Sequence, residues 1–310
     1  MNVRARPPTR ADDGRLTLER DGADWPLRDS SRFVEAGGLR WHVQILGDGP
    51  TLLMVHGTGA STHSWRDLAP LLARRFRVVA PDLPGHGFSD ALPPRALSLP
   101  GMARALGALS RALGPSPEIV VGHSAGAALL ARMCLDGAIS PRLLVGLNGA
   151  LLPFPGIAGQ LFPSMAKLLF LNPLAPRVFA WSADRHAASR LLKGTGSTLD
   201  ARGIDLYARL FANRFHVAGA LGMMANWDLA ALRRDWPRLT TRVALVVASG
   251  DTTIPPGDAE VVAKGLPHAT IHRLSGVGHL AHEEKPERVA ELIEALAVEA
   301  RVISARETRA

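Results

Sequence analysis

The sequence predicts an α/β protein with an eight-stranded, mostly parallel sheet flanked by helices. Short runs rich in Val, Ile and Leu alternate with segments of helical period, which is the pattern of parallel sheets whose strands are joined by helices. Between residues 150 and 236 this alternation stops, and the segment is helical with many large apolar side chains. We therefore expect a helical cap inserted after the sixth strand.

The apolar runs and the helical periods define the expected elements. Strands are predicted over Phe33 to Glu35, Trp41 to Leu46, Leu52 to Val55, Val78 to Pro81, Ile119 to Gly122, Leu143 to Leu147, Ala244 to Ala248 and Thr270 to Leu274. Helices outside the cap are predicted over His63 to Ala73, Gly101 to Leu113, Ala125 to Asp136, Asp258 to Lys264 and Glu283 to Ala300. This order divides the chain into an N-terminal tail (1–30), a sheet core (31–149 and 237–310) and the cap (150–236).

Charge and composition narrow the class of protein. The formal net charge is +8, but the basic residues are spread along the chain with no run longer than two, which argues against a nucleic-acid groove. The positive charge fits a solvated surface or, alternatively, an anionic partner such as a membrane surface or a ligand with carboxylates. A single cysteine, Cys134, provides no disulfide framework, and the N-terminus lacks the apolar region of a signal peptide. We expect a cytoplasmic protein, with contact at the inner membrane surface as an option.

One long stretch, Leu143 to Ala166, has no charged residue and is long enough to be considered as a membrane-spanning segment. Pro153, Pro155 and Pro163 interrupt it, so it cannot form a continuous spanning helix. No transmembrane segment is predicted.

Ser124 is the candidate nucleophile. It lies at the centre of a Gly-x-Ser-x-Gly pattern between the strand that ends at Gly122 and the helix that begins at Ala125. A strand, this turn and a helix in succession form a nucleophile elbow, which exposes the serine hydroxyl on a sharp, strained turn. Gly122 and Gly126 flank the serine because side chains at these positions would collide.

A serine hydroxyl needs a base and a group that orients the base. Asp251 follows the seventh strand and is the candidate acid, although a turn or capping role would also suit it. His279 follows the eighth strand and precedes the final helix, which favours it as the base over the other ten histidines. Asp228 is a weaker alternative acid, and Asn148, at the end of the sixth strand, carries no charge.

The oxyanion formed on attack needs hydrogen-bond donors. We expect these to be the backbone amides of Ala125, directly after the nucleophile, and of Thr58, in the loop after the third strand. His56 in that loop lacks partners at metal-site spacing, so a structural hydrogen bond is the favoured role. No metal site is predicted.

These motifs together resemble the α/β-hydrolase superfamily. The resemblance spans Phe33 to Ala300 and rests on the elbow, the loop at His56-Gly57, the loop Asp82 to Ser89 and the late pair Gly278-His279. It implies an antiparallel second strand and a cap after the sixth strand. Because residue 124 is a serine, the chain lacks the aspartate nucleophile of haloalkane dehalogenases and epoxide hydrolases.

Longer stretches resemble a narrower family, the magnesium-chelatase accessory proteins of bacteriochlorophyll biosynthesis in anoxygenic phototrophic bacteria. They are Asp24 to Arg28, Gly38 to Gln44, His56 to Trp65, Gly122 to Ala128, Asn148 to Pro153, Met223 to Leu229 and Gly278 to Glu284. This resemblance implies work at or near magnesium insertion into protoporphyrin IX. The chain has no Walker motif, so it is not the ATP-driven motor subunit of a chelatase.

A bulky apolar small molecule is the expected ligand, protoporphyrin IX or its magnesium form being the one that the resemblance implies. The residues expected to line its pocket are His56, Gly57, His123, Phe154, Met223, Met224 and Trp227. His216 is a weaker candidate for an axial ligand of chelated magnesium. The expected partners are magnesium-chelatase subunits and a membrane surface, with no nucleic acid and no bound cofactor.

Three functions remain open on the sequence alone. The first is a serine hydrolase of an ester or related acyl bond in this pathway, with Ser124, His279 and Asp251 as its triad. The second is a generic esterase or cofactor-free perhydrolase for a bulky hydrophobic substrate. The third is a tetrapyrrole-binding module that keeps the fold without catalysis.

Overall fold

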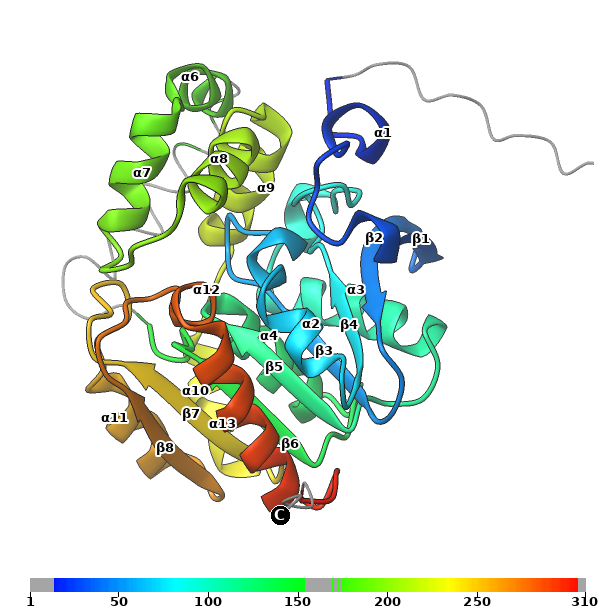
Figure 1. The fold of residues 1–310 in the computed structure, drawn as a ribbon, viewed down its shortest axis with the longest axis vertical. Helices are drawn as coiled ribbons and strands as arrows, with labels where there is room; N and C mark the ends of the chain where they lie inside the picture. Colours follow the sequence, from blue (N-terminus) through cyan, green and yellow to red (C-terminus); the bar gives the residue numbers. More distant parts are fainter. Residues whose placement is uncertain (1–13, 154–168, 170–171, 173, 306–310) are drawn as a thin grey trace, which may run out of the picture.

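A computed structural model describes residues 14–153, 169, 172 and 174–305 of the chain (Figure 1). Within these residues eight strands form one sheet in the order β1-β2-β4-β3-β5-β6-β7-β8. The strands are β1 Ser31–Ala36, β2 Leu39–Leu46, β3 Thr51–Val55, β4 Arg77–Pro81, β5 Ile119–His123, β6 Leu143–Leu147, β7 Arg242–Ala248 and β8 Ala269–Leu274. Strand β2 pairs antiparallel with β1 and β4, and the other pairs are parallel. The predicted fold class and all eight predicted strands are confirmed.

The α-helices of the described residues are α1 Leu18–Asp21, α2 Leu68–Leu72, α3 Leu99–Ala112, α4 Ala125–Leu135, α6 Ala175–Ser182, α7 Arg185–Lys193, α8 Ala201–Phe211, α9 Arg214–Ala225, α10 Ala230–Asp235, α11 Asp258–Gly265, α12 Ala281–Glu284 and α13 Pro286–Glu299. The 3₁₀ turns are η1 Arg28–Ser30, η2 Thr62–Trp65, η3 Pro94–Ala96 and η4 Trp236–Arg238. None of these helices has both the length and the apolar character needed to cross a bilayer.

Two predicted helices are each divided in the structure. The segment from His63 to Ala73 consists of the turn η2 followed by α2, and the segment from Glu283 to Ala300 consists of the end of α12 followed by α13. In the second case Pro286 begins a new helix, because proline lacks the N–H that a continuous helix would need there. The apolar period of the final helix, Val289 to Leu296, lies entirely within α13, so it did not show where that helix begins.

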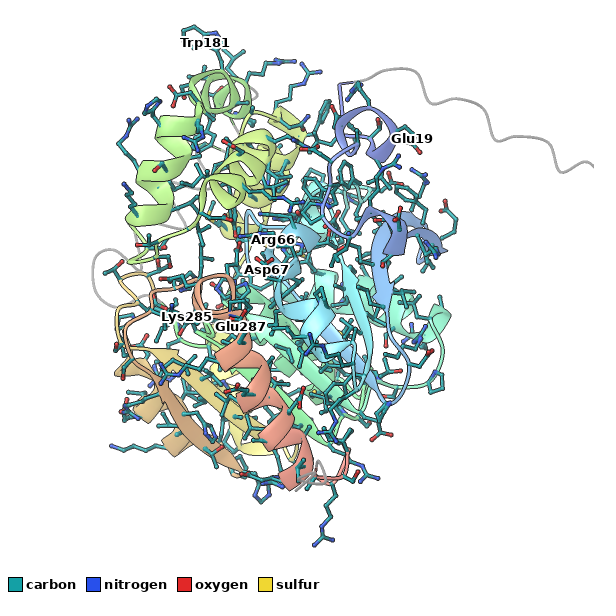
Figure 2. All side chains as sticks on the ribbon, viewed as in Figure 1. Glu19, Arg66, Asp67, Trp181, Lys285 and Glu287 are labelled. Carbon is teal, nitrogen blue, oxygen red and sulfur yellow. The ribbon has the colours of Figure 1, made fainter. Side chains whose placement is uncertain are left out.

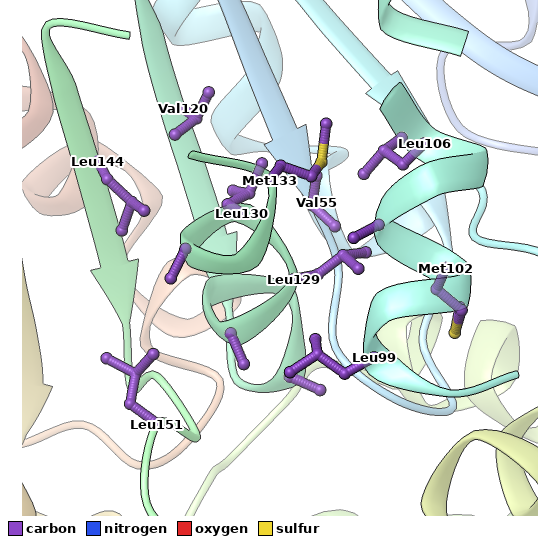
Figure 3. Close-up of a cluster of buried hydrophobic side chains, with 14 of the residues drawn as sticks. Val55, Leu99, Met102, Leu106, Val120, Leu129, Leu130, Met133, Leu144 and Leu151 are labelled. Atoms are coloured by element: carbon purple, nitrogen blue, oxygen red, sulfur yellow. The ribbon is translucent and has the colours of Figure 1, made fainter. Parts of the chain in front are cut away.

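Both faces of the sheet are buried, as the continuous apolar strands require. On one face Val120 of β5 packs with residues of α3 and α4, among them Leu106 and Leu129 (Figure 3). On the other face Val121, the next residue of β5, belongs to a cluster that includes Ile293 of α13. The core is therefore a three-layer α/β/α arrangement, with the strands β3 to β7 contributing alternate side chains to the two clusters.

The helices α6 to α9 follow β6 in the chain and lie together at one end of the sheet (Figure 1). They fall within the predicted cap. The predicted pocket residue Phe154 lies outside the described residues. Hereafter the cap means the described helices α6 to α10.

The described part of the predicted N-terminal tail, residues 14–30, packs against the rest of the molecule. Trp25 is buried, and its Nε1 donates a hydrogen bond to Thr62 Oγ1 at 3.2 Å. Asp24 forms an ion pair of 2.7 Å with Arg209 of α8. This segment therefore contacts both the core and the cap.

Candidate active site

Ser124 occupies the turn between β5 and α4 with φ 50° and ψ −119°, a strained conformation for a residue other than glycine. The flanking glycines are needed for this turn. A Cβ atom at Gly122 would lie 2.5 Å from the amide nitrogen of Ala127, and one at Gly126 would lie 2.2 Å from the carbonyl oxygen of Val55. Larger residues would therefore push α4 away from the sheet, so the glycines hold the serine at the end of β5.

Asp251 and His279 come together at the carboxyl ends of β7 and β8. The distance between His279 Nδ1 and Asp251 Oδ2 is 2.7 Å, and both side chains are buried. The other carboxylate oxygen of Asp251 accepts the amide N–H groups of Thr253 at 2.8 Å and Ile254 at 2.9 Å. With Nδ1–H donating to the carboxylate, the Nε2 atom of His279 is the one available to act as a base.

Two further side chains hold the backbone of the His279 loop. Asn148 Nδ2 donates to the carbonyl oxygens of Gly278 at 3.2 Å and His279 at 2.7 Å, while its Oδ1 accepts the amide of Ala248 at 2.8 Å. His123 Nε2 lies 3.0 Å from the same His279 carbonyl oxygen, to which it donates. Burial holds the pKa of His123 well below its usual value, so this ring is neutral. Asn148, noted in the sequence only for its lack of charge, links the strand before Asp251 to the His279 loop.

A linker between α7 and α8 also contacts both loops, although no sequence motif distinguishes it. The carbonyl oxygen of Thr195 accepts the amides of His279 at 3.3 Å and Thr252 at 3.4 Å. Ser197 Oγ accepts the amide of Leu280 at 2.8 Å. The only available signal was the run Gly-Thr-Gly-Ser from residue 194, which is ordinary loop composition. The cap is thus attached to the loops that carry the acid and the base.

Ser124 and His279 line one cavity of about 760 Å³ between the core and the cap. Its described lining is mainly apolar and includes Phe179, Leu191, Phe211, Val217, Leu221, Met224, Trp227 and Ile254. This volume lies within the range of pockets that enclose a whole small molecule. An apolar wall with a few polar groups at one point suits a bulky hydrophobic ligand presented to Ser124.

The two expected oxyanion donors lie in the same cavity. Thr58 and Ala125 both line it, and among the described residues neither backbone N–H has a hydrogen-bond partner. Ala125 is the first residue of α4, where amides have no partner within the helix. Both amides are therefore free to bind a developing negative charge.

The remaining predicted pocket residues divide into two groups. Gly57, His123, Met224 and Trp227 line the cavity, whereas His56 and Met223 lie behind its wall. His56 donates from Nδ1 to the Gly57 carbonyl oxygen at 2.8 Å and accepts the Leu83 amide at Nε2 at 2.9 Å. Met223 is fully buried, and its sulfur accepts a hydrogen bond from Thr58 Oγ1 at 3.4 Å. Both residues support the Thr58 loop from behind, so their side chains cannot reach a ligand.

Two weaker candidates have other partners. Both nitrogens of His216 are occupied: Nδ1 accepts the Gly87 amide at 3.1 Å, and Nε2 donates to the Gly59 carbonyl oxygen at 3.0 Å. His216 therefore has no nitrogen free to coordinate magnesium. Asp228 lines the cavity, but its Oδ1 accepts the Ala230 amide and it is Asp251 that contacts His279. Within the described chain no three His, Cys, Asp or Glu side chains are placed to hold a metal ion.

A buried carboxylate, Glu283, joins the segment after His279 to Arg66 at the end of η2 and to Tyr207 of the cap. Glu283 Oε2 lies 2.5 Å from Arg66 Nη1, and its Oε1 accepts the hydroxyl of Tyr207 of α8 at 2.8 Å. Burial raises the pKa of Glu283 to about 7. The side chains of Arg66 and Glu283 are 5% and 0% exposed, so neither charge has water as an alternative partner.

We expect Glu283→Ala to lower the free energy of unfolding by about 3 kcal/mol, the lower end for a broken buried pair, because the Arg66 cation loses its one buried carboxylate and keeps only the more exposed Asp67 and Asp200. The measurement is denaturant unfolding of both proteins at pH 7.5. Glu118→Ala is the matched control, since it breaks the exposed Arg142–Glu118 pair and should cost less than about 1 kcal/mol. Equal losses in the two variants would contradict the role given to the buried pair.

Comparison with known proteins agrees with this geometry. Residues 52–292 match the alpha/beta hydrolase family. Over 264 residues the chain is 42% identical to the protein named magnesium-chelatase 30 kDa subunit of Rhodobacter capsulatus, covering 84% of this chain and 92% of that protein. It is 28% identical over 261 residues to the pimeloyl-(acyl-carrier protein) methyl ester esterase of Methylococcus capsulatus, covering 81% and 96%. Among solved structures, the epoxide hydrolase CorEH superposes with a TM-score of 0.74 at 22% identity, covering 87% and 98%.

Proposed function

Since the chain belongs to the α/β-hydrolase family, we propose that it is a serine hydrolase that cleaves an ester or related acyl bond of a bulky apolar substrate. The observation that carries this proposal is the convergence on one apolar cavity of Ser124, the His279–Asp251 pair and two amides that have no partner among the described residues. A site that only bound its ligand would need neither a strained serine nor an oriented histidine.

The reaction begins when His279 Nε2 removes the proton of the Ser124 hydroxyl as Oγ attacks the substrate carbonyl carbon. The amides of Thr58 and Ala125 bind the resulting oxyanion, and Asp251 stabilises the imidazolium. His279 then donates its proton to the leaving group, whose bond to the acyl carbon breaks. Water, deprotonated by His279, releases the acyl group from Ser124 and restores the free enzyme.

The similarity to the magnesium-chelatase 30 kDa subunit supports a place for this hydrolase in bacteriochlorophyll biosynthesis, at or near magnesium insertion into protoporphyrin IX. The apolar cavity suits a tetrapyrrole or a hydrophobic derivative of one. A serine, a histidine and an aspartate do not themselves place a metal ion in a ring. We therefore propose that the chain acts beside the chelatase subunits, on a bond of the substrate or of an associated molecule.

A fluorophosphonate probe tests the hydrolytic function directly, because it reacts covalently with an activated serine. We expect one probe per chain, located by mass spectrometry on the peptide that contains Ser124. Ser140→Ala, which changes an exposed serine, is the control and should label fully. A folded protein that remains unlabelled would overturn the hydrolase proposal.

The place in the pathway has a separate test. A Rhodobacter capsulatus strain without its 30 kDa subunit should recover pigment when it expresses this chain. Recovery by the Ser124→Ala variant as well would show that ligand binding suffices in the cell. Failure of the wild-type chain, with labelling of Ser124 intact, would remove the pathway but leave the hydrolase.

A further inference from the structure

The outer face of the cap helix α6 carries a row of exposed apolar side chains. Leu174, Val178 and Trp181 are 57%, 61% and 89% exposed. Their spacing of four and three residues places them on one side of the helix. Figure 2 shows Trp181 at the outermost edge of the cap, directed away from the rest of the molecule. Large apolar side chains grouped in this way on a surface indicate an interaction site.

The charge around this row is positive. The segment from residue 174 to 193 contains Arg177, Arg185, Arg190 and Lys193 against a single acid, Asp184. All four basic residues are exposed. Asp184 is engaged as the cap of α7, where it accepts the Ala187 amide at 2.7 Å, and Arg185 pairs with Asp205 of α8 at 2.5 Å. A tryptophan and aliphatic side chains, with Arg177 on the same helix and Arg185 at the start of the next, form the composition of a surface that lies in the headgroup region of an anionic bilayer.

The cavity reaches this surface. Phe179 of α6 and Leu191 of α7 both line the cavity and are 43% and 52% exposed. The cavity wall at Phe179 and Leu191 is therefore both apolar and open to solvent, and α6 carries this wall as well as the exposed row. A hydrophobic molecule dissolved in a bilayer would pass from the lipid to the pocket along this wall, with little exposure to water.

We propose that this α6 face, Leu174, Val178 and Trp181 with the basic Arg177 and Arg185, docks on anionic lipid bilayers and that the pocket receives its apolar substrate there. The positive charge selects a bilayer with anionic headgroups over a neutral apolar partner. The docking of the α6 face does not depend on the proposed hydrolase function, whereas the delivery of substrate rests on it.

Co-sedimentation with vesicles tests the docking surface without any hydrolysis. The full chain should pellet with phosphatidylglycerol/phosphatidylcholine vesicles at low salt, and much less with pure phosphatidylcholine or at high salt. Arg177→Ala should weaken binding about fivefold. Trp181→Ala should weaken it by a similar factor or more, and both variants should retain the labelling of Ser124, since neither residue lines the cavity.

Val261→Ala is the matched control, because Val261 is an apolar residue of α11 with 45% exposure, outside the cap. This variant should bind vesicles like the wild type. Equal binding by the Trp181 and Val261 variants, or a wild-type chain that stays in the supernatant, would overturn the proposal. So would a dimer in light scattering that Trp181→Ala dissociates, because the face would then belong to a second copy of the chain.

Discussion

Replacement of Ser124 by Ala is expected to lower the turnover of a long-chain p-nitrophenyl ester about ten-thousandfold or more, with the fold unchanged. The reason is that His279 and Asp251 have no other hydroxyl to activate at the end of β5, so only the oxyanion amides and ligand binding remain. The measurement is kcat/KM at pH 8 for wild type and variant. A variant that keeps more than a tenth of the activity would assign the reaction to another group.

The same position offers a control that separates chemistry from strain. Ser124→Gly removes the same hydroxyl but also removes the side chain from a backbone with φ 50° and ψ −119°. Such a conformation costs about 1–3 kcal/mol for a residue with a Cβ atom, against about 0.5–1 kcal/mol lost to the greater freedom of unfolded glycine. We expect Ser124→Gly to melt at a higher temperature than Ser124→Ala, with both inactive. Equal melting temperatures would mean that the elbow stores little strain.

The fold could be predicted from the sequence because its signals are local. A parallel strand buried on both faces is a short run of branched apolar residues, and β5 and β6 carry that pattern without interruption. The elbow is equally local, since Gly122, Ser124 and Gly126 stand within five residues and their roles follow from the turn that they form. The order of Asp251 and His279 after successive strands then places both at the same edge of the sheet.

Contacts between residues far apart in the chain could not be predicted from local sequence patterns. Asn148 holds the carbonyl of a residue 131 positions later, and Tyr207 reaches Glu283 across 76 positions. No spacing rule connects such residues. Side-chain direction was likewise undetermined, so His56 and Met223 were expected in the pocket although they lie behind Thr58. The sequence identifies the chemistry of this site, while the packing of the cap decides which residues meet the ligand.

Six buried histidines make the stability of the protein depend on pH. His56, His63, His86, His123, His216 and His282 are all buried. Burial lowers the pKa of His216 to about 4 and that of His282 to about 3. Geometry supports the neutral form of His216, because its Nδ1 accepts the Gly87 amide and a proton there would face another N–H group. His282 has no hydrogen-bond partner for either nitrogen among the described residues, and its ring lies against Trp65 and His123.

Because these histidines are buried and neutral, we expect the free energy of unfolding to fall as the pH is lowered below about 6.5. Between pH 6.5 and the lowered pKa, the unfolded chain binds a proton at each ring and the folded chain does not, so the free energy of unfolding falls as the pH falls. Below about pH 6 each ring contributes about 1.4 kcal/mol per pH unit, so His216 and His282 together remove about 3 kcal/mol between pH 6.5 and pH 5. The raised pKa of Glu283 acts with the opposite sign and offsets about one ring of this loss. Urea unfolding across this range measures the slope.

His282→Phe should flatten that slope by about one proton, since phenylalanine keeps a ring against Trp65 and cannot titrate. The absolute stability of this variant is secondary, because a slightly larger ring in a closed site has its own packing cost. His268→Gln is the matched control, because His268 is exposed to solvent and should leave the slope as in the wild type. A slope that His282→Phe leaves unchanged would show that this ring is already protonated in the folded protein, and the acid sensitivity would then have to come from other groups.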